Sequence, residues 1–196
     1  MAIVMRMRWD GVTQDQYDQV RKVVAWEEER PTGGILHEAW FEGDQLNVCD
    51  VWETPDDFQA FVAERLMPGV AQVGIAGQPD VRILPLYNCQ LAKPAIPGAV
   101  VEEDEGPADG YKAVEAQVRW RDVPPIGGIS HVAAVDGDVI RAVSVWESRA
   151  DHDAFYADRI GPALAQFGIP APAPATDDDF HPLHALFDAA GTLATS

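Results

Sequence analysis

Two histidines lie in segments that could support proton-transfer chemistry. His37 and His131 each fall in a stretch where apolar and polar residues alternate, which predicts a strand with one buried face. Each histidine is on the more apolar face, which we expect to pack against helices. A neutral imidazole titrates near pH 7 and can act as a general base. We therefore take His37 as a candidate catalytic base; the structural alternative is a buried imidazole held by one backbone hydrogen bond.

A hydrophobic pocket is expected around His37. The residues predicted to share its side of the sheet are apolar or aromatic, namely Met5, Met7, Cys49 and Phe61. Small-molecule sites are mostly apolar clefts with a few polar groups, so we assign these residues to substrate binding. His131, the matching residue of the second half, is assigned in the same way.

The opposite face of the predicted strands carries charged, polar and aromatic residues from both halves of the chain. These residues are Arg6, Glu38, Trp40, Asp50 and Trp52 in the first half, and Glu115, Gln117, Ser144 and Trp146 in the second. If the two sheets pack face to face, these groups meet in the interior, where buried charges must pair. Two interpretations remain open: a satisfied polar seam, or a ligand-binding lumen in which Asp50 is a second candidate catalytic residue. Trp52 and Trp146, which precede capped helices, also have a purely structural interpretation.

Metal and cofactor sites have little support in the sequence. The acidic run at 177–179, together with His181 and His184, suggests a metal site, but the two histidines project to opposite faces of a strand and Pro182 separates them. The sequence contains no GxGxxG, P-loop, GxSxG or HExxH motif. We therefore expect neither a metal nor a cofactor.

The elements that must position these residues come in two copies. Residues 33–75 align without a gap on residues 127–169, and 20 of the 43 aligned positions are identical, which indicates a duplication. Upstream, the segment that ends at Trp9 resembles the segment that ends at Trp120. Between that tryptophan and the Gly-Gly pair, the first half has room for a helix, whereas the second half has only residues 121–126.

Local signals set the order of elements within each half. Gly43 and Gly137 mark hairpin turns, and Thr54 and Ser148 are predicted to cap helices. Both helices are expected to kink or break at a proline and to end at a glycine; the residues concerned are Pro68 and Pro162, then Gly74 and Gly168. A final strand closes each half, so the first half reads βαββαβ, the order of a ferredoxin-like unit.

The predicted fold class is therefore α+β, with two tandem ferredoxin-like units. We assign residues 1–90 to the first unit, 91–110 to a linker rich in Pro, Gly and acidic residues, and 111–190 to a second unit that lacks its first helix. The open sheet faces are expected to cover each other in an intramolecular pseudo-dimeric barrel. This arrangement predicts a monomer with internal twofold symmetry.

The strand ends VWET (51–54) and VWES (145–148), each followed nine residues after the tryptophan by Phe61 or Phe155, resemble a known family. The chain is similar to the dimeric α+β barrel proteins related to the antibiotic biosynthesis monooxygenases. The resemblance implies cofactor-independent oxygenation, cyclisation or isomerisation of a hydrophobic, polyketide-like substrate. The haem-degrading branch has Trp at the place of these phenylalanines and a ligating His about ten residues further on; Ala71 and Ala165 stand there, so haem cleavage is not expected.

Composition excludes several other functions. The 196 residues include 14 Lys and Arg against 32 Asp and Glu, which gives a formal net charge of −18 and predicts that nucleic acids and anionic membranes are repelled. No apolar stretch approaches the length of a signal peptide core or a membrane span, so we expect a cytoplasmic protein. Cys49 and Cys89 are expected to be free thiols. The alternative to an enzyme is a non-catalytic ligand-binding or protein-interaction module.

Overall fold

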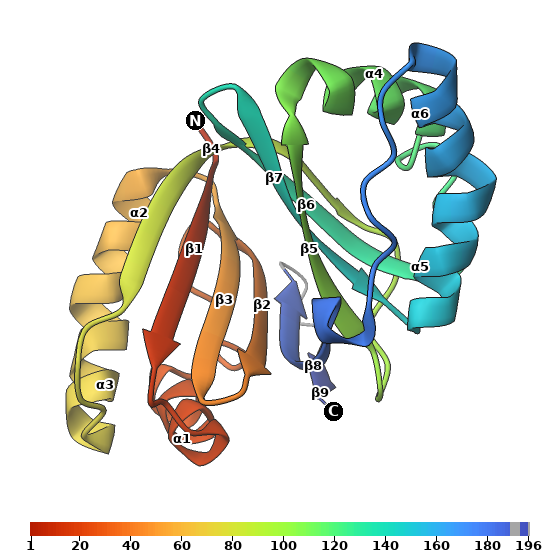
Figure 1. Cartoon of the computed structure of the whole chain (residues 1–196). Helices are drawn as coiled ribbons and strands as arrows, with labels where there is room; N and C mark the ends of the chain where they lie inside the picture. The colour runs from red at the N-terminus through yellow and green to blue at the C-terminus, as the bar shows by residue number, and fades with distance from the viewer. Residues whose placement is uncertain (189–192, 196) are drawn as a thin grey trace.

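The computed structural model describes residues 1–188 and the backbone of 193–195, so the predicted end of the second unit at residue 190 lies outside the described residues. The chain forms two units of the same element order (Figure 1). Unit 1 contains β1 (Ile3–Asp10), α1 (Gln14–Val24), β2 (Gly34–Glu42), β3 (Gln45–Trp52), α2 (Pro55–Phe61), η1 (Val62–Leu66), α3 (Met67–Val73) and β4 (Asp80–Leu91). Unit 2 contains β5 (Val100–Pro107), α4 (Ala108–Val118), β6 (Gly128–Asp136), β7 (Val139–Trp146), α5 (Arg149–Phe155), η2 (Tyr156–Ile160), α6 (Gly161–Phe167), η3 (Asp177–Asp179), β8 (Phe180–Asp188) and β9 (Leu193–Thr195).

The strands close into one barrel because β4 and β8 each pair with both units. β4 pairs with β1 through Asp80–Pro85 and then with β6 through Leu86–Leu91. β8 pairs with β5 through Phe180–Pro182 and then with β2 through Leu183–Asp188. The resulting order, β2-β3-β1-β4-β6-β7-β5-β8, returns to β2 and is antiparallel throughout, with β9 added along β8. The predicted α+β barrel of two tandem units is confirmed.

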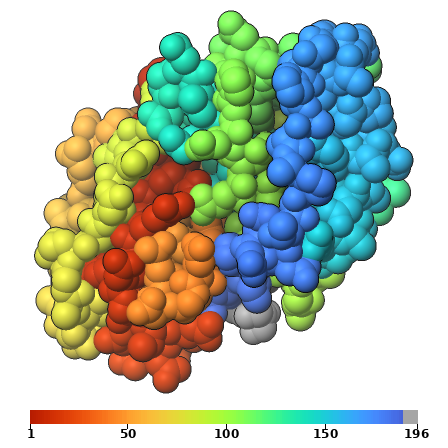
Figure 2. Space-filling model, viewed as in Figure 1, coloured from red at the N-terminus to blue at the C-terminus, as the bar shows by residue number. Residues whose placement is uncertain are grey.

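Helices cover the outer faces of the barrel, with α2 and α3 on one side of the molecule and α5 and α6 on the opposite side (Figure 1). One apolar cluster lies between the sheet of unit 1 and its helices, and another fills the barrel lumen with residues of both units. In the space-filling view, the red-to-yellow surface of unit 1 lies directly against the green-to-blue surface of unit 2 (Figure 2). Each sheet therefore buries one face against helices and the other against the opposite sheet.

The local signals for the second helical segment of each unit are confirmed. The side chain of Thr54 accepts a hydrogen bond from the backbone N–H of Asp57 at 3.1 Å, and Ser148 accepts one from Asp151 at 3.2 Å. The predicted break takes the form of the π-helical turns η1 and η2, which end just before the proline-containing helices α3 and α6. None of the described helices combines the length and the apolar character needed to cross a membrane.

The prediction that unit 2 lacks its first helix is wrong. Residues 114–120, predicted as a strand, belong to α4 and its C-terminal cap, and the first strand of unit 2 is β5. β5 and the start of α4 lie within the segment predicted as a linker; the connection between β4 and β5 is residues 92–99. The counterpart of Trp120 is therefore Trp26, at the same offset of 94 as the rest of the repeat, and not Trp9.

The physical reason lies in two misleading patterns. Val114 and Val118 are buried, whereas Ala116 between them is exposed, so the buried spacing is the four residues of a helix and not the two of a strand. The β5 sequence VVEEDEGP is rich in acidic residues, which have low strand propensity. β5 forms nevertheless because it pairs with β7 along its whole length and with β8 at its start.

Candidate active site

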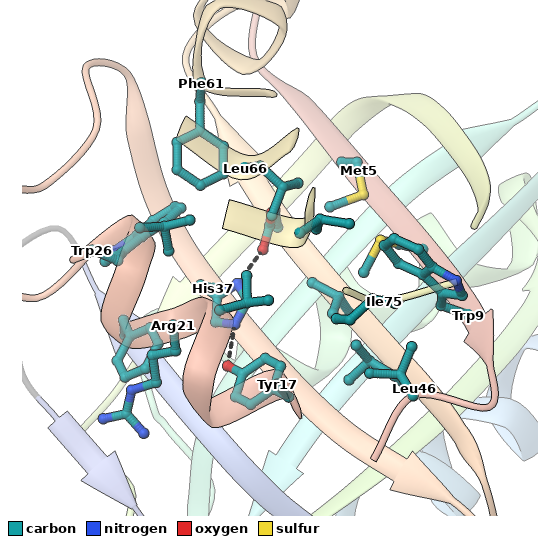
Figure 3. Close-up of a pocket in the computed structure, with 18 residues that line it drawn as sticks. Met5, Trp9, Tyr17, Arg21, Trp26, His37, Leu46, Phe61, Leu66 and Ile75 are labelled. Carbon is teal, nitrogen blue, oxygen red and sulfur yellow. Dashed lines mark hydrogen bonds and ion pairs between the residues drawn. The ribbon is translucent and has the colours of Figure 1, made fainter. Parts of the chain in front are cut away.

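A cavity of about 80 Å³ lies in unit 1 between the sheet and the helices (Figure 3). Its walls come from β1, β2 and β3 on one side and from α1 and the α2–η1–α3 segment on the other. The lining is mainly apolar and includes Met5, Met7, Trp9, Val20, Val24, Trp26, Leu46, Val48, Phe61, Leu66, Val70, Ile75 and Phe187. The predicted neighbourhood of His37, Met5, Met7 and Phe61 is thus brought together.

Three polar side chains form a hydrogen-bonded chain in the wall of this cavity (Figure 3). The hydroxyl of Tyr17 lies 2.7 Å from Nε2 of His37, and Nδ1 of His37 lies 2.7 Å from Oδ1 of Asp50. His37 and Asp50 are directly opposite each other on β2 and β3, so both project toward the helices, while Tyr17 reaches them from α1. We call these three residues the unit 1 relay.

The unit 1 relay has a defined hydrogen-bond polarity. An ionised carboxylate can only accept hydrogen bonds, so Nδ1 of His37 donates to Asp50. Nε2 of a neutral His37 then accepts from the hydroxyl of Tyr17. Burial raises the pKa of Tyr17 well above its usual value, and the nearby positive charge of Arg21 opposes that shift. The phenol therefore holds its proton at rest and can pass it to His37 when the phenolic oxygen receives another.

Aromatic contacts fix the position of the imidazole. Phe187 from β8 stacks on His37 with ring centroids 5.2 Å apart and an interplanar angle of 9°. The guanidinium of Arg21 lies 4.7 Å from the centre of the Phe187 ring and pairs with Glu27 at 2.5 Å. Because β8 belongs to unit 2, the position of His37 depends on closure of the barrel.

Unit 2 repeats the same arrangement with one change in chemistry. The hydroxyl of Tyr111 contacts Nε2 of His131, and Nδ1 of His131 lies 3.0 Å from Oγ of Ser144. Ser144 is the counterpart of Asp50, so the second histidine lacks a carboxylate on Nδ1. Burial lowers the pKa of His131 to about 4, which keeps this imidazole neutral at pH 7.

Several predicted site residues lie on the other side of the sheet from the one expected. The prediction that Asp50, Trp52, Ser144 and Trp146 lie in the lumen is wrong, because they face the helices, where Trp52 contacts Phe61 with ring centroids 5.2 Å apart. The prediction that Cys49 lies in the His37 pocket is also wrong, because Cys49 belongs to the lumen cluster. The reason is the register: residue 37 pairs with residue 50, and adjacent residues of a strand project to opposite faces.

The lumen holds only part of the predicted polar set. Nη2 of Arg6 lies 2.8 Å from Oε1 of Glu103, and the fully buried Glu38 accepts a hydrogen bond from the hydroxyl of Ser130, across the barrel. Burial raises the pKa of Glu38 to about 7. Trp40 is also fully buried in the lumen cluster.

Glu115 and Gln117 are not in the lumen, because they lie on α4. Glu115 accepts a hydrogen bond from the hydroxyl of Tyr87 at 2.8 Å, and Gln117 is exposed.

The acidic run at 177–179 makes local contacts: Asp177 contacts Arg149, and Asp179 is hydrogen-bonded to Thr176. His184 pairs with Asp18 at 3.0 Å. Within residues 1–188, no group of three or more His, Cys, Asp or Glu side chains is arranged to hold a metal ion.

Tyr17 and Trp26 are the site residues that reasoning from the sequence missed. Trp26 lies with its ring centroid 5.5 Å from that of His37. The signal that could have found both is the offset of 94, which carried upstream pairs Tyr17 with Tyr111 and Trp26 with Trp120. The similarity between the short segments that end at Trp9 and Trp120 hides this match in the sequence.

Comparisons with known proteins identify the fold. No protein-family model and no curated protein matches the sequence. A putative monooxygenase from Fusobacterium nucleatum is similar in structure, with a TM-score of 0.70, 10% identity and coverage of 100% of this chain and 98% of that chain. A putative monooxygenase from Lactobacillus acidophilus has a TM-score of 0.68, 11% identity and coverage of 100% and 97%. An anthrone oxidase-like protein has a TM-score of 0.50, 13% identity and coverage of 100% and 96%. The chain therefore shares the α+β barrel fold of these structures, which is the fold that the resemblance in its sequence implied.

Proposed function

We propose that the unit 1 cavity is the active site of a cofactor-independent enzyme that removes a proton from a hydrophobic, polyketide-like substrate. The observation that carries this proposal is the unit 1 relay, a base with a buried carboxylate behind it, set in an otherwise apolar wall. Such a pairing of histidine and acid is a common way to build a general base.

The relay supplies a complete path for one proton. The phenolic oxygen of Tyr17 takes a proton from the substrate as its own proton passes to Nε2 of His37. The imidazolium that forms is stabilised by Asp50, which is only 3% exposed, so the attraction is weakly screened by water. The step does not change the net charge of the cavity. It converts a neutral substrate into an anion that lies beside the newly formed imidazolium of His37.

The substrate anion can then react in three ways. An electron-rich enolate or phenolate can react with O₂, can be reprotonated at another carbon, or can attack a carbonyl group in the same molecule. These outcomes correspond to oxygenation, isomerisation and cyclisation. The relay acts in the same way in all three, so the substrate determines which one follows.

Substrate binding requires the cavity walls to move. A volume of about 80 Å³ is well below the 300–1,000 Å³ typical of sites for drug-sized ligands. Leu66 of the π-helical turn η1 and Val70 of α3 form part of the wall opposite the sheet. π-Helical turns are frequent at functional sites, and we expect this segment to shift outward when a polycyclic substrate binds.

The proposal is tested with anthrone, chosen because one structural neighbour is named anthrone oxidase-like. Anthrone and O₂ would give anthraquinone and water, which can be followed by oxygen consumption and absorbance. We expect Asp50→Asn and Tyr17→Phe each to lower kcat by about 100-fold or more, as loss of general acid–base catalysis does. Asp56→Asn, which removes an exposed acid outside the cavity, is the control and is expected to retain full activity. Turnover that survives Asp50→Asn in a folded protein would refute the role of the relay.

The pairing of the three relay side chains with one another favours a second candidate, a binding protein without catalysis. In that case a hydrophobic ligand binds in unit 1 and the relay serves to satisfy buried polar groups. Binding of anthrone with no oxygen consumption and no exchange of its acidic protons with deuterium would support this candidate over the enzyme.

A further inference from the structure

A second, larger pocket lies against one end of the unit 1 cavity. It has a volume of about 350 Å³, and its mostly polar lining includes Arg8, Asp10, Gln45, Gln78 and Asp80. We call it the outer pocket. Trp9 lines both the outer pocket and the unit 1 cavity, and in the close-up it lies at the end of the cavity away from Trp26 and Arg21 (Figure 3). The indole of Trp9 is therefore a wall that the two spaces share.

The connection between α3 and β4, residues 74–79, runs along both spaces. Ile75 lines the unit 1 cavity, whereas Gly77 lines the outer pocket. Between them, the backbone carbonyl oxygen of Ala76 accepts a hydrogen bond of 3.0 Å from Nε1 of Trp9. This bond holds the indole at the boundary between the cavity and the outer pocket.

Trp9 has few contacts that fix its ring. Trp26, at the other end of the cavity, packs against the rings of His37, Trp52 and Phe61. Within residues 1–188, no aromatic ring packs against Trp9 in this way. In the same part of the chain, residues 76–78 form no hydrogen bond to another backbone group. Segments with few such bonds open most readily, so the indole can move together with the connection that holds it.

Unit 2 shows that the barrel does not need an indole at this place. Trp9 is opposite Leu46 in the pairing of β1 with β3, and Gly106 is opposite Ile140, the counterpart of Leu46, in the pairing of β5 with β7. In the part of the chain that the structure describes, a Cβ atom on Gly106 would meet no atom within 4 Å apart from its chain neighbours. Unit 2 thus leaves open the space that Trp9 fills in unit 1. The indole is specific to the unit that carries the relay.

The polar groups of the outer pocket are of mixed charge. Arg8 contributes a cation, and Asp10 and Asp80 contribute two carboxylates. Nε2 of Gln45 donates a hydrogen bond of 2.6 Å to Oδ1 of Asp10, so amide groups add further donors and acceptors. A charged ligand group would meet a like charge in this lining. Hydroxyl groups, which both donate and accept hydrogen bonds, can bond to all of these side chains.

We infer that the unit 1 cavity and the outer pocket are two parts of one elongated substrate site, and that Trp9 is the specificity-determining partition between them. The cavity takes the apolar ring system beside the relay, and the outer pocket takes a neutral, hydroxyl-rich end of the same molecule. The cavity of about 80 Å³ is too small for such a ligand, whereas the outer pocket adds about 350 Å³ once the indole moves aside. This assignment rests on the function proposed for the cavity and extends it to the far end of the substrate.

The test is calorimetric titration of the full chain with 2-hydroxyanthraquinone and with its 2-O-glucoside. Both are anthraquinones, the oxidised product class of the anthrone reaction, so neither is consumed during the titration. Gln78→Trp fills the outer pocket with an exposed side chain and should weaken binding of the glucoside at least tenfold, but binding of 2-hydroxyanthraquinone less than twofold. Gln59→Trp, the same change at an exposed position of α2 outside both spaces, should alter neither affinity. Melting temperatures establish that each variant is folded.

Variants of Trp9 give a second measurement. Trp9→Phe keeps an aromatic ring but lacks the N–H that bonds to Ala76, so the partition should open more easily. We expect it to strengthen binding of the glucoside about fivefold, as loss of one hydrogen bond from the closed form predicts, and to leave 2-hydroxyanthraquinone unchanged. Trp9→Ala removes the partition and should increase the ratio of the two affinities further in the same direction.

The outcomes separate this inference from the proposed function. Binding of 2-hydroxyanthraquinone without binding of the glucoside, or glucoside binding that Gln78→Trp leaves unchanged, would overturn the inference while the cavity stays the candidate active site. The expected binding pattern without turnover of anthrone would support the elongated site and refute the proposed reaction. Failure of both anthraquinones to bind would overturn both proposals.

Discussion

Glu38 in the barrel lumen provides a test of how a buried carboxyl group limits the stability of the closed barrel. Its side chain is fully buried between the units and accepts a hydrogen bond from Ser130. Burial raises the pKa from 4.5 to about 7, with the Ser130 hydrogen bond and Arg6 opposing the shift. The folded protein therefore favours the neutral acid.

The sign and size of the effect follow from proton linkage. The folded state binds the Glu38 proton more tightly than the unfolded state does. The stabilisation from this proton is therefore complete below pH 4.5 and is lost as the pH rises through 7. At about 1.36 kcal/mol per pKa unit, ionisation costs about 1 kcal/mol at pH 5, about 2 at pH 6 and about 3 above pH 7.5. Glu38→Gln removes the ionisation but keeps the shape of the side chain. We therefore expect the variant to gain about 3 kcal/mol over the wild type between pH 4.5 and pH 8.

The assay is urea unfolding of both proteins from pH 4.5 to pH 8.5. Other buried acids such as Glu102 change the stability of both proteins alike, so the difference between the two curves isolates Glu38. The control is Glu28→Gln, an exposed acid, for which we expect a difference below about 0.5 kcal/mol at every pH. A stability difference for Glu38→Gln that stays within 1 kcal/mol across the range would show that the carboxyl is not buried as the structure describes.

Three further predictions concern the repeat and its sites. Ser144→Asp places a carboxylate on Nδ1 of His131 and should raise the pKa of that histidine from about 4, measured by NMR titration; an unchanged value would contradict the role given to this contact. Thr54→Ala removes the cap on α2 and should cost about 1 kcal/mol in urea unfolding, and no loss of stability would show that the cap contributes little. Since β4 and β8 close the barrel within one chain, light scattering should give the mass of a monomer, 21.4 kDa, and a stable dimer would contradict this.

The sequence alone was sufficient for features set by local chemistry. The hairpin turns at Gly43 and Gly137 and the caps at Thr54 and Ser148 depend on residues close together in the chain. The duplication is visible as a direct match between two segments of the sequence. The alternation of the strands around His37 identified one apolar face, which led to the correct grouping of Met5, Met7 and Phe61 with that histidine.

The features that failed depend on partners distant in the chain. β5 has an acidic sequence and becomes a strand only because β7 and β8 pair with it. Two buried residues four apart, such as Val114 and Val118, fit either a helix or an alternating strand. The packing of α4 on the sheet decides between the two.

The site itself was decided by tertiary structure. Which face of β3 carries Asp50 depends on its register with β2, and a shift of one residue would exchange Asp50 with Cys49. Tyr17 completes the unit 1 relay from a helix 20 residues away, and Phe187 reaches His37 from the other unit. Periodicity within one segment carries no information on any of these contacts, since each is set by how separate elements pack in the closed barrel.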